Sequence, residues 1–201
     1  MASFPENEGS FVQSEDIAIR RMRDDTHDYL WMSGWLTDDR VLEFYEGRDN
    51  PHDLAKVVEK FGPRARGQDS TVPCIMLHED VPIGYIQYYP VAESERHEYQ
   101  LETIDGVYGV DLFIGNPDLW NQGIGTRMLS MIVDYLFDEL DALKVVIDPQ
   151  VSNHRAVRSY EKCGFERVKV LQNHDLHEGE YRDCWLMTID RKPVSERAPR
   201  S

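Results

Sequence analysis

The sequence lacks the features that mark membrane-spanning and secreted proteins. It contains no run of about 18 apolar residues, the length that a membrane-spanning helix needs. Its first residues are polar and acidic, and they do not show the basic-then-apolar pattern of a secretory signal. We therefore expect a cytoplasmic protein.

Cysteine is also scarce. The chain has three cysteines (Cys74, Cys163 and Cys184), and no C-x-x-C pair or Cys/His cluster occurs. An odd number of widely spaced cysteines argues against a disulfide framework. His174 and His177 have the spacing of one helix face, but the segment between residues 170 and 181 is expected to form a loop. We therefore expect no metal site.

Positive charge is in short supply, with 22 Lys and Arg against 37 Asp and Glu and a net charge of −15. Such a charge repels nucleic acid and anionic membranes, so we expect neither as a partner, whereas it can attract a polycation. Solubility alone also accounts for an acidic composition. The distribution is more informative, because one short segment carries five acids and only Arg96 as a fixed positive charge. These acids are Glu93, Glu95, Glu98, Glu102 and Asp105.

The length of 201 residues fits one domain with a single core. We expect this domain to cover residues 15–190, with a flexible N-terminal extension at 1–14 and a flexible tail at 191–201. Apolar periodicity predicts the order β–α–α–β–β–β–α–β–α–β–β, an α/β domain with a mixed central sheet of about seven strands flanked by about four helices. The expected helices cover roughly 24–36, 53–62, 123–139 and 153–162, and the expected strands roughly 17–23, 72–78, 83–91, 107–114, 144–147, 165–171 and 183–189.

A glycine pair lies where an expected strand gives way to a long expected helix, in the sequence WNQGIGT at residues 120–126. Positions without side chains let backbone N–H groups approach a pyrophosphate, which also faces the positive end of the helix dipole. No Gly-Lys-Ser/Thr follows, so this is not a Walker loop, and a Rossmann turn would need a third glycine. Ordinary turn residues at a helix start are the alternative, because a lone G-x-G is a weak pattern.

A second motif follows the glycine pair, and the two together are more specific than either alone. Residues 153–165 have the pattern N-x-x-A-x-x-x-Y-x-x-x-G-F, and they follow the glycine pair after one helix and one strand. This arrangement closely resembles the GNAT acetyltransferases over about residues 15–190, which implies the GNAT fold and acetyl-CoA as co-substrate. On this resemblance, the coenzyme A pyrophosphate would lie against Gln122, Gly123, Ile124, Gly125 and Thr126.

The same resemblance places other residues at the coenzyme. Asn153 would bond the pantetheine arm, Tyr160 would lie near the thioester sulfur, and Phe113 and Ile114 would also contact the cofactor. From the residues alone, Asn153 could instead cap its helix and Tyr160 could be an ordinary core residue. The chain has Trp120 where the family usually has Gln or Arg. Because the loop acts mainly through backbone N–H groups, we expect binding to survive this change.

Further segments narrow the resemblance to the aminoglycoside 6′-N-acetyltransferases, above all to the acetyltransferase half of the bifunctional acetyltransferase–phosphotransferase. They are WLTDDRVLEFY at 35–45, VPIGY at 81–85, YGVD at 108–111, Asp148-Pro149, and HDLHEG at 174–179. The resemblance implies that Asp111 accepts the proton or orients the attacking amine, and that Tyr108 has an active-site role. Leu112 stands where relatives often carry Gln. A strand-end aspartate that bonds a loop amide is the alternative for Asp111.

The implied reaction transfers the acetyl group of acetyl-CoA to the 6′-amine of an aminoglycoside, by direct attack in a ternary complex. The amine is mostly protonated at neutral pH, so a carboxylate must take its proton. A backbone N–H near residues 112–114 could stabilise the oxyanion, and Tyr160 could protonate the departing thiolate. Candidate substrate contacts are Glu43, Tyr45, Glu46, Glu102 and Asp148, although an exposed acid can equally be a solvated surface charge.

Two other functions remain open on the sequence alone. The chain could acetylate another amine, such as a polyamine, a peptide N-terminus or a siderophore precursor. It could also be an acetyl-CoA-binding module without activity, against which the presence of Asp111 and Tyr160 argues. A monomer and a homodimer are both compatible with the sequence.

Overall fold

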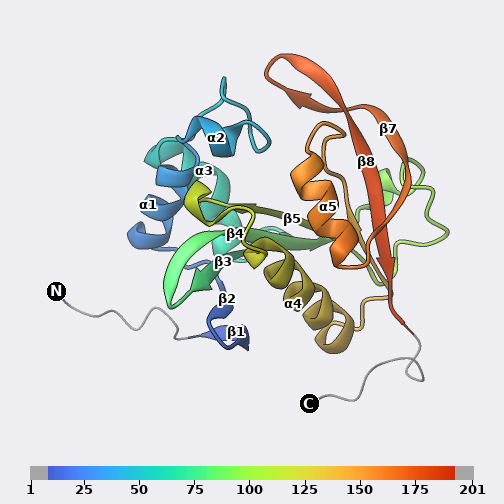
Figure 1. Cartoon of the computed structure of the whole chain (residues 1–201), viewed down its shortest axis with the longest axis horizontal. Coiled ribbons are helices and arrows are strands. Elements are labelled where there is room, and N and C mark those ends of the chain that lie inside the picture. Colours follow the sequence, from blue (N-terminus) through green and yellow to red (C-terminus); the bar gives the residue numbers. More distant parts are fainter. Residues whose placement is uncertain (1–8, 193–201) are drawn as a thin grey trace.

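An eight-stranded mixed sheet runs through the protein in the computed structural model, which describes residues 9–192 (Figure 1). The strands are β1 Ser10–Ser14, β2 Ile17–Arg21, β3 Val72–His78, β4 Val81–Pro90, β5 Val107–Ile114, β6 Lys144–Ile147, β7 Glu166–His177 and β8 Glu180–Asp190. The α-helices are α1 Thr26–Trp35, α2 Asp39–Leu42, α3 Leu54–Ala65, α4 Ile124–Glu139 and α5 His154–Lys162. Short 3₁₀ helices, η1 Glu93–Glu95 and η2 Pro117–Leu119, lie in the connections on either side of β5.

The strand order is β1-β2-β3-β4-β5-β6-β8-β7, and the β5–β6 pair is parallel whereas the other pairs are antiparallel. The parallel pairing ends at Gly109 and Val146, although β5 continues to Ile114. Beyond that register position the two strands separate. The sheet therefore has a gap at the C-terminal ends of its two central strands, and this gap determines where the site lies.

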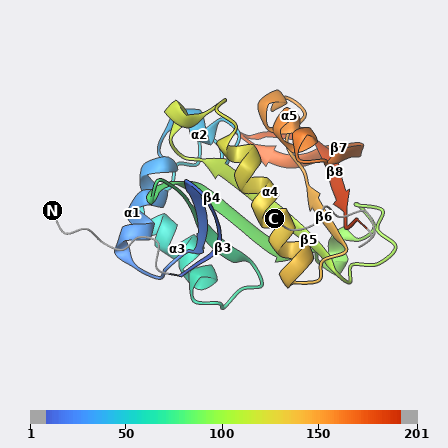
Figure 2. The ribbon, with the colours of Figure 1, turned by 60° about the horizontal axis from the view of Figure 1, so that its bottom comes forward.

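The helices cover both faces of the sheet because the apolar residues of the strands alternate between the faces. One core joins Ile75, Leu77 and Tyr85 to apolar residues of α1, α2 and α3. The other joins Cys74, Met76 and Ile86 to the apolar side of α4 and to Val157 and Tyr160 of α5. Figure 2 shows α4 lying across β4 and β5 on its own side of the sheet.

The sequence-based boundaries of the central strands and of the main helices agree with the structure to within a few residues, but both ends of the sheet are longer than expected. Residues 10–14 form β1, which pairs with β2, so the sheet begins inside the segment predicted to be a flexible extension. Residues 1–8 and 193–201 lie outside the described part of the chain.

The loop expected between residues 170 and 181 is instead the tip of a long hairpin formed by β7 and β8. Its two-residue turn is Glu178-Gly179, and both residues have positive φ (52° and 74°), as a hairpin turn that matches the strand twist requires. Most side chains near the tip are polar or exposed, so no apolar alternation marked the strands.

Candidate active site

A cavity of about 800 Å³ opens at the gap between β5 and β6. Residues of α4 and α5, from one side of the sheet, and of β5, α3 and the connector 41–50, from the other, line it together. The gap thus joins the two sides of the sheet. Twelve residues predicted from the sequence line the cavity: Tyr45, Glu46, Asp111, Phe113, Ile114, Gly123, Ile124, Gly125, Thr126, Asp148, Asn153 and Tyr160.

The glycine loop differs from the other helix starts of the described chain. Helices α1, α2, α3 and α5 begin at Asp25, Asp38, Asp53 and Asn153, whose side chains accept a backbone N–H of the first turn. Helix α4 begins at Gly123, with φ of 83° and no side-chain cap. A Cβ added at Gly123 would meet nothing within 4 Å. The first N–H groups of a 16-residue helix therefore face the cavity and can bind phosphate oxygens, which fits a pyrophosphate.

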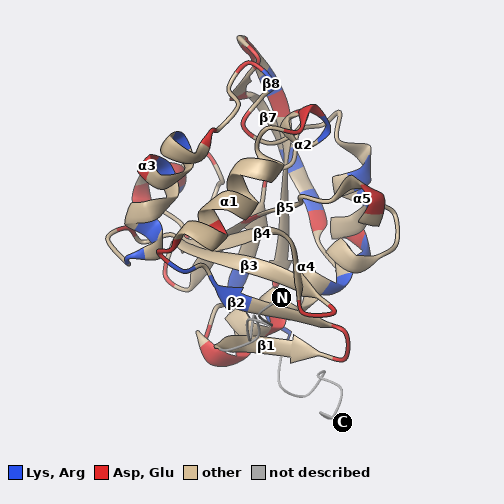
Figure 3. Ribbon diagram, turned by 90° about the vertical axis from the view of Figure 1, so that its left-hand side faces the viewer, with Lys and Arg blue, Asp and Glu red and all other residues tan. Residues whose placement is uncertain are grey.

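Basic side chains gather at the same end of the cavity. Arg155, Arg158 and Lys162 of α5 line it, and Figure 3 shows basic positions on α5. The Arg155 guanidinium lies 3.7 Å from the centroid of the Trp120 ring. The Trp120 indole N–H in turn donates to the carbonyl oxygen of Ile114, at 2.9 Å. The residue that departs from the family pattern therefore supports a cation beside the phosphate loop.

Asn153 and Tyr160 occupy the wall between the two ends of the cavity. The Asn153 side chain accepts the backbone N–H of Ala156 at 3.1 Å, so it does cap α5 while it also lines the cavity. Its bond to pantetheine stays a prediction. The Tyr160 side chain is 8% exposed, and burial raises the pKa of its hydroxyl, which therefore stays protonated and able to donate.

Asp111 lies on β5 where the cavity meets the α3 side of the sheet. Burial raises the pKa of its carboxyl to about 7, and the nearby carboxylate of Asp148 adds to the rise. Hydrogen bonds from Gln87 and Tyr89 act in the opposite direction. A carboxyl with a pKa near neutrality is a far better proton acceptor than an ordinary aspartate, and it can still be ionised when substrate binds.

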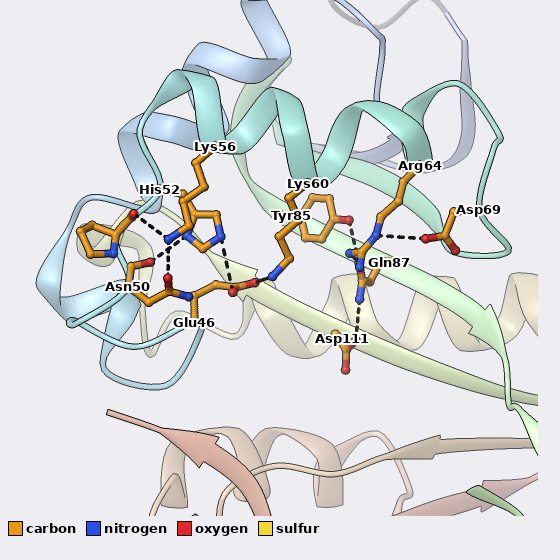
Figure 4. A network of polar contacts seen from close by, with 11 residues as sticks. Glu46, Asn50, His52, Lys56, Lys60, Arg64, Asp69, Tyr85, Gln87 and Asp111 are labelled. Atoms are coloured by element: carbon orange, nitrogen blue, oxygen red, sulfur yellow. Dashed lines mark hydrogen bonds and ion pairs between the residues drawn. The ribbon is translucent and has the colours of Figure 1, made fainter. Parts of the chain in front are cut away.

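Gln87, which sequence reasoning missed, positions Asp111. The two residues are cross-strand partners on β4 and β5, and the Gln87 Nε2 donates to Asp111 Oδ2 at 2.7 Å. The side-chain amide of Gln87 cannot flip, because its Oε1 accepts from Arg64 Nη1 and from the Tyr85 hydroxyl, both at 2.8 Å (Figure 4). A glutamine at a buried position of an otherwise apolar strand was the available signal.

Gln87→Leu tests this arrangement. The variant removes a hydrogen bond that favours ionised Asp111, so the pKa of Asp111 should rise. The acidic limb of the kcat/KM profile should move up by about one pH unit, which corresponds to one hydrogen bond. Tyr85→Phe is the matched control, because it leaves the contacts from Arg64 to Gln87 and on to Asp111 in place and should shift the limb less. Identical profiles for Gln87→Leu and wild type would contradict the assignment.

Asp148 follows β6 and lies at the same end of the cavity as Asp111. Its Oδ2 accepts from the Tyr99 hydroxyl at 3.1 Å and lies 2.8 Å from Nε2 of His174. The other ring nitrogen of His174, Nδ1, lies 2.9 Å from Oε1 of Glu98. Tyr99 and Glu98 belong to the acidic segment. This segment is therefore attached, directly and through His174 of β7, to the end of the cavity where Asp111 and Asp148 lie.

The tip of the β7–β8 hairpin lies beside the connector 41–50 (Figure 1), and side chains of the two segments are in contact. Nε2 of His177 lies 2.9 Å from the carbonyl oxygen of Glu43, and Arg48 Nη2 donates to Glu178 Oε2 at 2.8 Å. These contacts bring together two segments far apart in the sequence. Both segments contribute residues to the lining of the cavity.

Tyr108 does not join the site. Successive side chains of a strand point to opposite faces, so three positions place Tyr108 and Asp111 on different faces of β5. Tyr108 packs with Val110 against the core beneath α4 and does not line the cavity. The catalytic role of Tyr108 stays a prediction, and its side chain lies outside the set of residues that line the cavity.

Several predicted substrate contacts lie elsewhere. Glu43 is exposed and contributes only its backbone carbonyl, and Glu102 is exposed on the acidic segment outside the cavity. Gln122 is also exposed, and its amide donates to the carbonyl oxygen of Asp118. Glu46 lines the cavity, but its carboxylate is already paired with Lys60 and lies 3.5 Å from Nε2 of His52 (Figure 4).

Metal sites and membrane-spanning helices are two further features that residues 9–192 could form. Within that range no three His, Cys, Asp or Glu side chains are arranged to hold a metal ion. None of the helices formed by those residues combines the length and the apolar character needed to cross a bilayer.

Comparison with known proteins identifies the family. The acetyltransferase (GNAT) domain model matches residues 24–173. Aminoglycoside N(6′)-acetyltransferase type 1 of Klebsiella pneumoniae is 34% identical over 162 residues, which is 81% of this chain and 80% of the relative. The kanamycin resistance protein of Rhizobium radiobacter is 41% identical over 77 residues, 38% of this chain and 71% of the relative.

Solved structures agree with this result. The structure of AAC(6′)-Ib in complex with ribostamycin and coenzyme A superposes with a TM-score of 0.75 at 30% identity, covering 88% of this chain and 94% of that one. The chain therefore belongs to the GNAT acetyltransferases, in the family of the aminoglycoside N(6′)-acetyltransferases.

Proposed function

We propose that this protein transfers the acetyl group of acetyl-CoA to the 6′-amine of aminoglycosides of the kanamycin and tobramycin type, and thereby inactivates them. The observation that carries the proposal is the position of Asp111. Its carboxyl faces the same cavity as the uncapped start of α4, so one space holds both a phosphate-binding end and a proton acceptor.

The charges along the cavity support an anionic donor and a cationic acceptor. Arg155, Arg158 and Lys162 surround the glycine-loop end, where the phosphates of acetyl-CoA would lie. Asp111 and Asp148 lie at the other end, where ammonium groups of an amino sugar would bind. A neutral acceptor would bring no positive charge to these two carboxylates, whereas an ammonium group would compensate for their desolvation when the acceptor covers them.

The reaction follows from these positions. The acceptor ammonium gives a proton to Asp111, and the free amine attacks the carbonyl carbon of the thioester. The C–N bond forms, the C–S bond breaks, and the hydroxyl of Tyr160 gives its proton to the departing thiolate. The second proton of the amine then returns to Tyr160 as the amide is completed, and Asp111 releases the first proton to solvent. Burial keeps the Tyr160 hydroxyl protonated, so it can serve as this donor, and the ordinary acidity of a thiol makes the assistance modest.

Thiol release is the direct assay. We expect purified protein to release coenzyme A thiol from acetyl-CoA in the presence of kanamycin or tobramycin, and not with an aminoglycoside that carries a hydroxyl at the 6′ position. Absence of release above background with every 6′-amine drug would refute the substrate assignment. Release with a simple polyamine but with no drug would instead indicate a GNAT enzyme for another amine.

A further inference from the structure

His174 of β7 lies between two carboxylates at the acceptor end of the cavity. Its Nε2 is 2.8 Å from Asp148 Oδ2 and its Nδ1 is 2.9 Å from Glu98 Oε1. Ionised carboxylates only accept hydrogen bonds, so both ring nitrogens must carry a hydrogen. The ring is therefore an imidazolium, consistent with a pKa that the contacts with Asp148 and Glu98 raise to about 9.

The cation connects two parts of the chain that would otherwise repel each other. Glu98 belongs to the acidic segment between β4 and β5, whereas Asp148 follows β6 and lines the cavity. The Tyr99 hydroxyl donates to Asp148 Oδ2, the oxygen that also faces His174. Without the positive charge, two carboxylates would face each other with no cation between them.

Asp148 influences the reaction because its negative charge repels that of Asp111 and so raises the pKa of the Asp111 carboxyl. A diamine or polyamine can place its reacting amine at Asp111 and a second ammonium at Asp148. A fixed position of Asp148 then sets the distance between the two amines that the site accepts. The residue that fixes Asp148 thereby influences the choice of acceptor.

We propose that the imidazolium of His174 is a positioning residue for the amine acceptor: it fastens the acidic segment to β7 and holds Asp148 where it binds a second ammonium group of the substrate. This inference rests on the proposed function. It adds to that function a residue that acts through Asp148.

A purely electrostatic effect of His174 would have the opposite sign. A positive charge beside Asp148 weakens the attraction for an ammonium group, so its removal alone would strengthen acceptor binding. Positioning predicts weaker binding on removal, because Glu98 and Asp148 then repel and the acidic segment separates. The direction of the change in KM for the acceptor distinguishes the two effects.

We would compare His174→Gln with His97→Gln, which makes the same replacement at an exposed position of the acidic segment. His174→Gln should raise KM for kanamycin about tenfold, the scale of one charge-assisted hydrogen bond in a partly exposed setting. KM for acetyl-CoA should not change, and His97→Gln should behave as wild type. His174→Lys, which keeps a cation with several donors, should recover part of the loss.

Hydrogen–deuterium exchange of residues 92–105 gives a readout without turnover. The groups that face the ring are Asp148 after β6, and Glu98 and Tyr99 of the acidic segment. Raising the pH of wild type through about 9 should lower the protection of this segment, measured against the intrinsic exchange rate at each pH, as His174→Gln should at neutral pH.

An unchanged or lowered KM for kanamycin in His174→Gln would overturn the inference, as would unchanged exchange in residues 92–105. Acetyl-CoA binding by calorimetry confirms that the variant is folded. If wild type releases no thiol with any aminoglycoside, the proposed function fails. The exchange comparison still tests the attachment of the acidic segment in that case.

Discussion

Asp111→Asn is expected to lower kcat with kanamycin by about 10²–10⁴-fold, the usual contribution of a positioned general base. Asparagine has nearly the same shape as aspartate, and its side-chain oxygen can still accept the hydrogen bond from Gln87. It cannot take a proton from the acceptor ammonium. The loss should therefore fall mainly on kcat, while KM for acetyl-CoA stays close to the wild-type value.

The same variant has an expected effect on stability that makes the kinetic result interpretable. The pKa of Asp111 is raised from 3.8 to about 7 in the folded protein, so the folded state binds a proton that the unfolded state releases in that interval. The contribution of Asp111 to the free energy of unfolding is therefore largest at low pH, and it declines as pH rises from about 4 to about 7. Asp111→Asn removes that decline and should unfold no more easily than wild type at about pH 8.

Thermal unfolding at alkaline and acidic pH, together with thiol release, checks both statements. Asp148→Asn is the matched control, since it removes a carboxylate from the same end of the cavity and should act mainly on KM for the drug. Activity of Asp111→Asn within about twofold of wild type would show that Asp111 is not the base.

The local elements of this fold were predictable because each has a local cause. Helix α4 has apolar residues at helical spacing, and β5 lies between turn residues, so both were located to within a residue. The ends of the sheet were not, because β1 and the tip of the β7–β8 hairpin are stabilised by pairing with a neighbouring strand rather than by their own apolar patterns.

The residues of the site were likewise predictable where their role has a local cause and were missed where it depends on distant parts of the chain. Residues that act through the backbone or from a motif position, such as Gly123 and Asn153, were found from the sequence and line the cavity. Gln87 and His174 were missed, because their roles depend on cross-strand register and on contacts across the gap. The role of Tyr108 rests on the resemblance alone, and the alternation of side chains along β5 places Tyr108 and Asp111 on opposite faces of the strand.

Gly123→Asp is expected to weaken acetyl-CoA binding by about 10²-fold, equivalent to the loss of one strong charge-assisted hydrogen bond of about 3 kcal/mol. Gly123 has φ of 83°, a left-handed conformation that aspartate and asparagine tolerate better than other residues, and a Cβ there meets nothing within 4 Å. The chain should therefore fold. The new carboxylate would accept the first N–H groups of α4 and repel the pyrophosphate from them.

Gly123→Asn separates these two effects, because asparagine has the same shape and can cap α4 but carries no charge. We expect it to weaken acetyl-CoA binding much less than Gly123→Asp, and calorimetric titration of both variants measures the difference. Weakening by Gly123→Asp should also diminish at high salt, since the repulsion is partly screened there. Equal affinity of Gly123→Asp and wild type would mean that phosphates do not bind at the start of α4. The cavity would then have to bind an acetyl donor other than acetyl-CoA, or bind acetyl-CoA in another way.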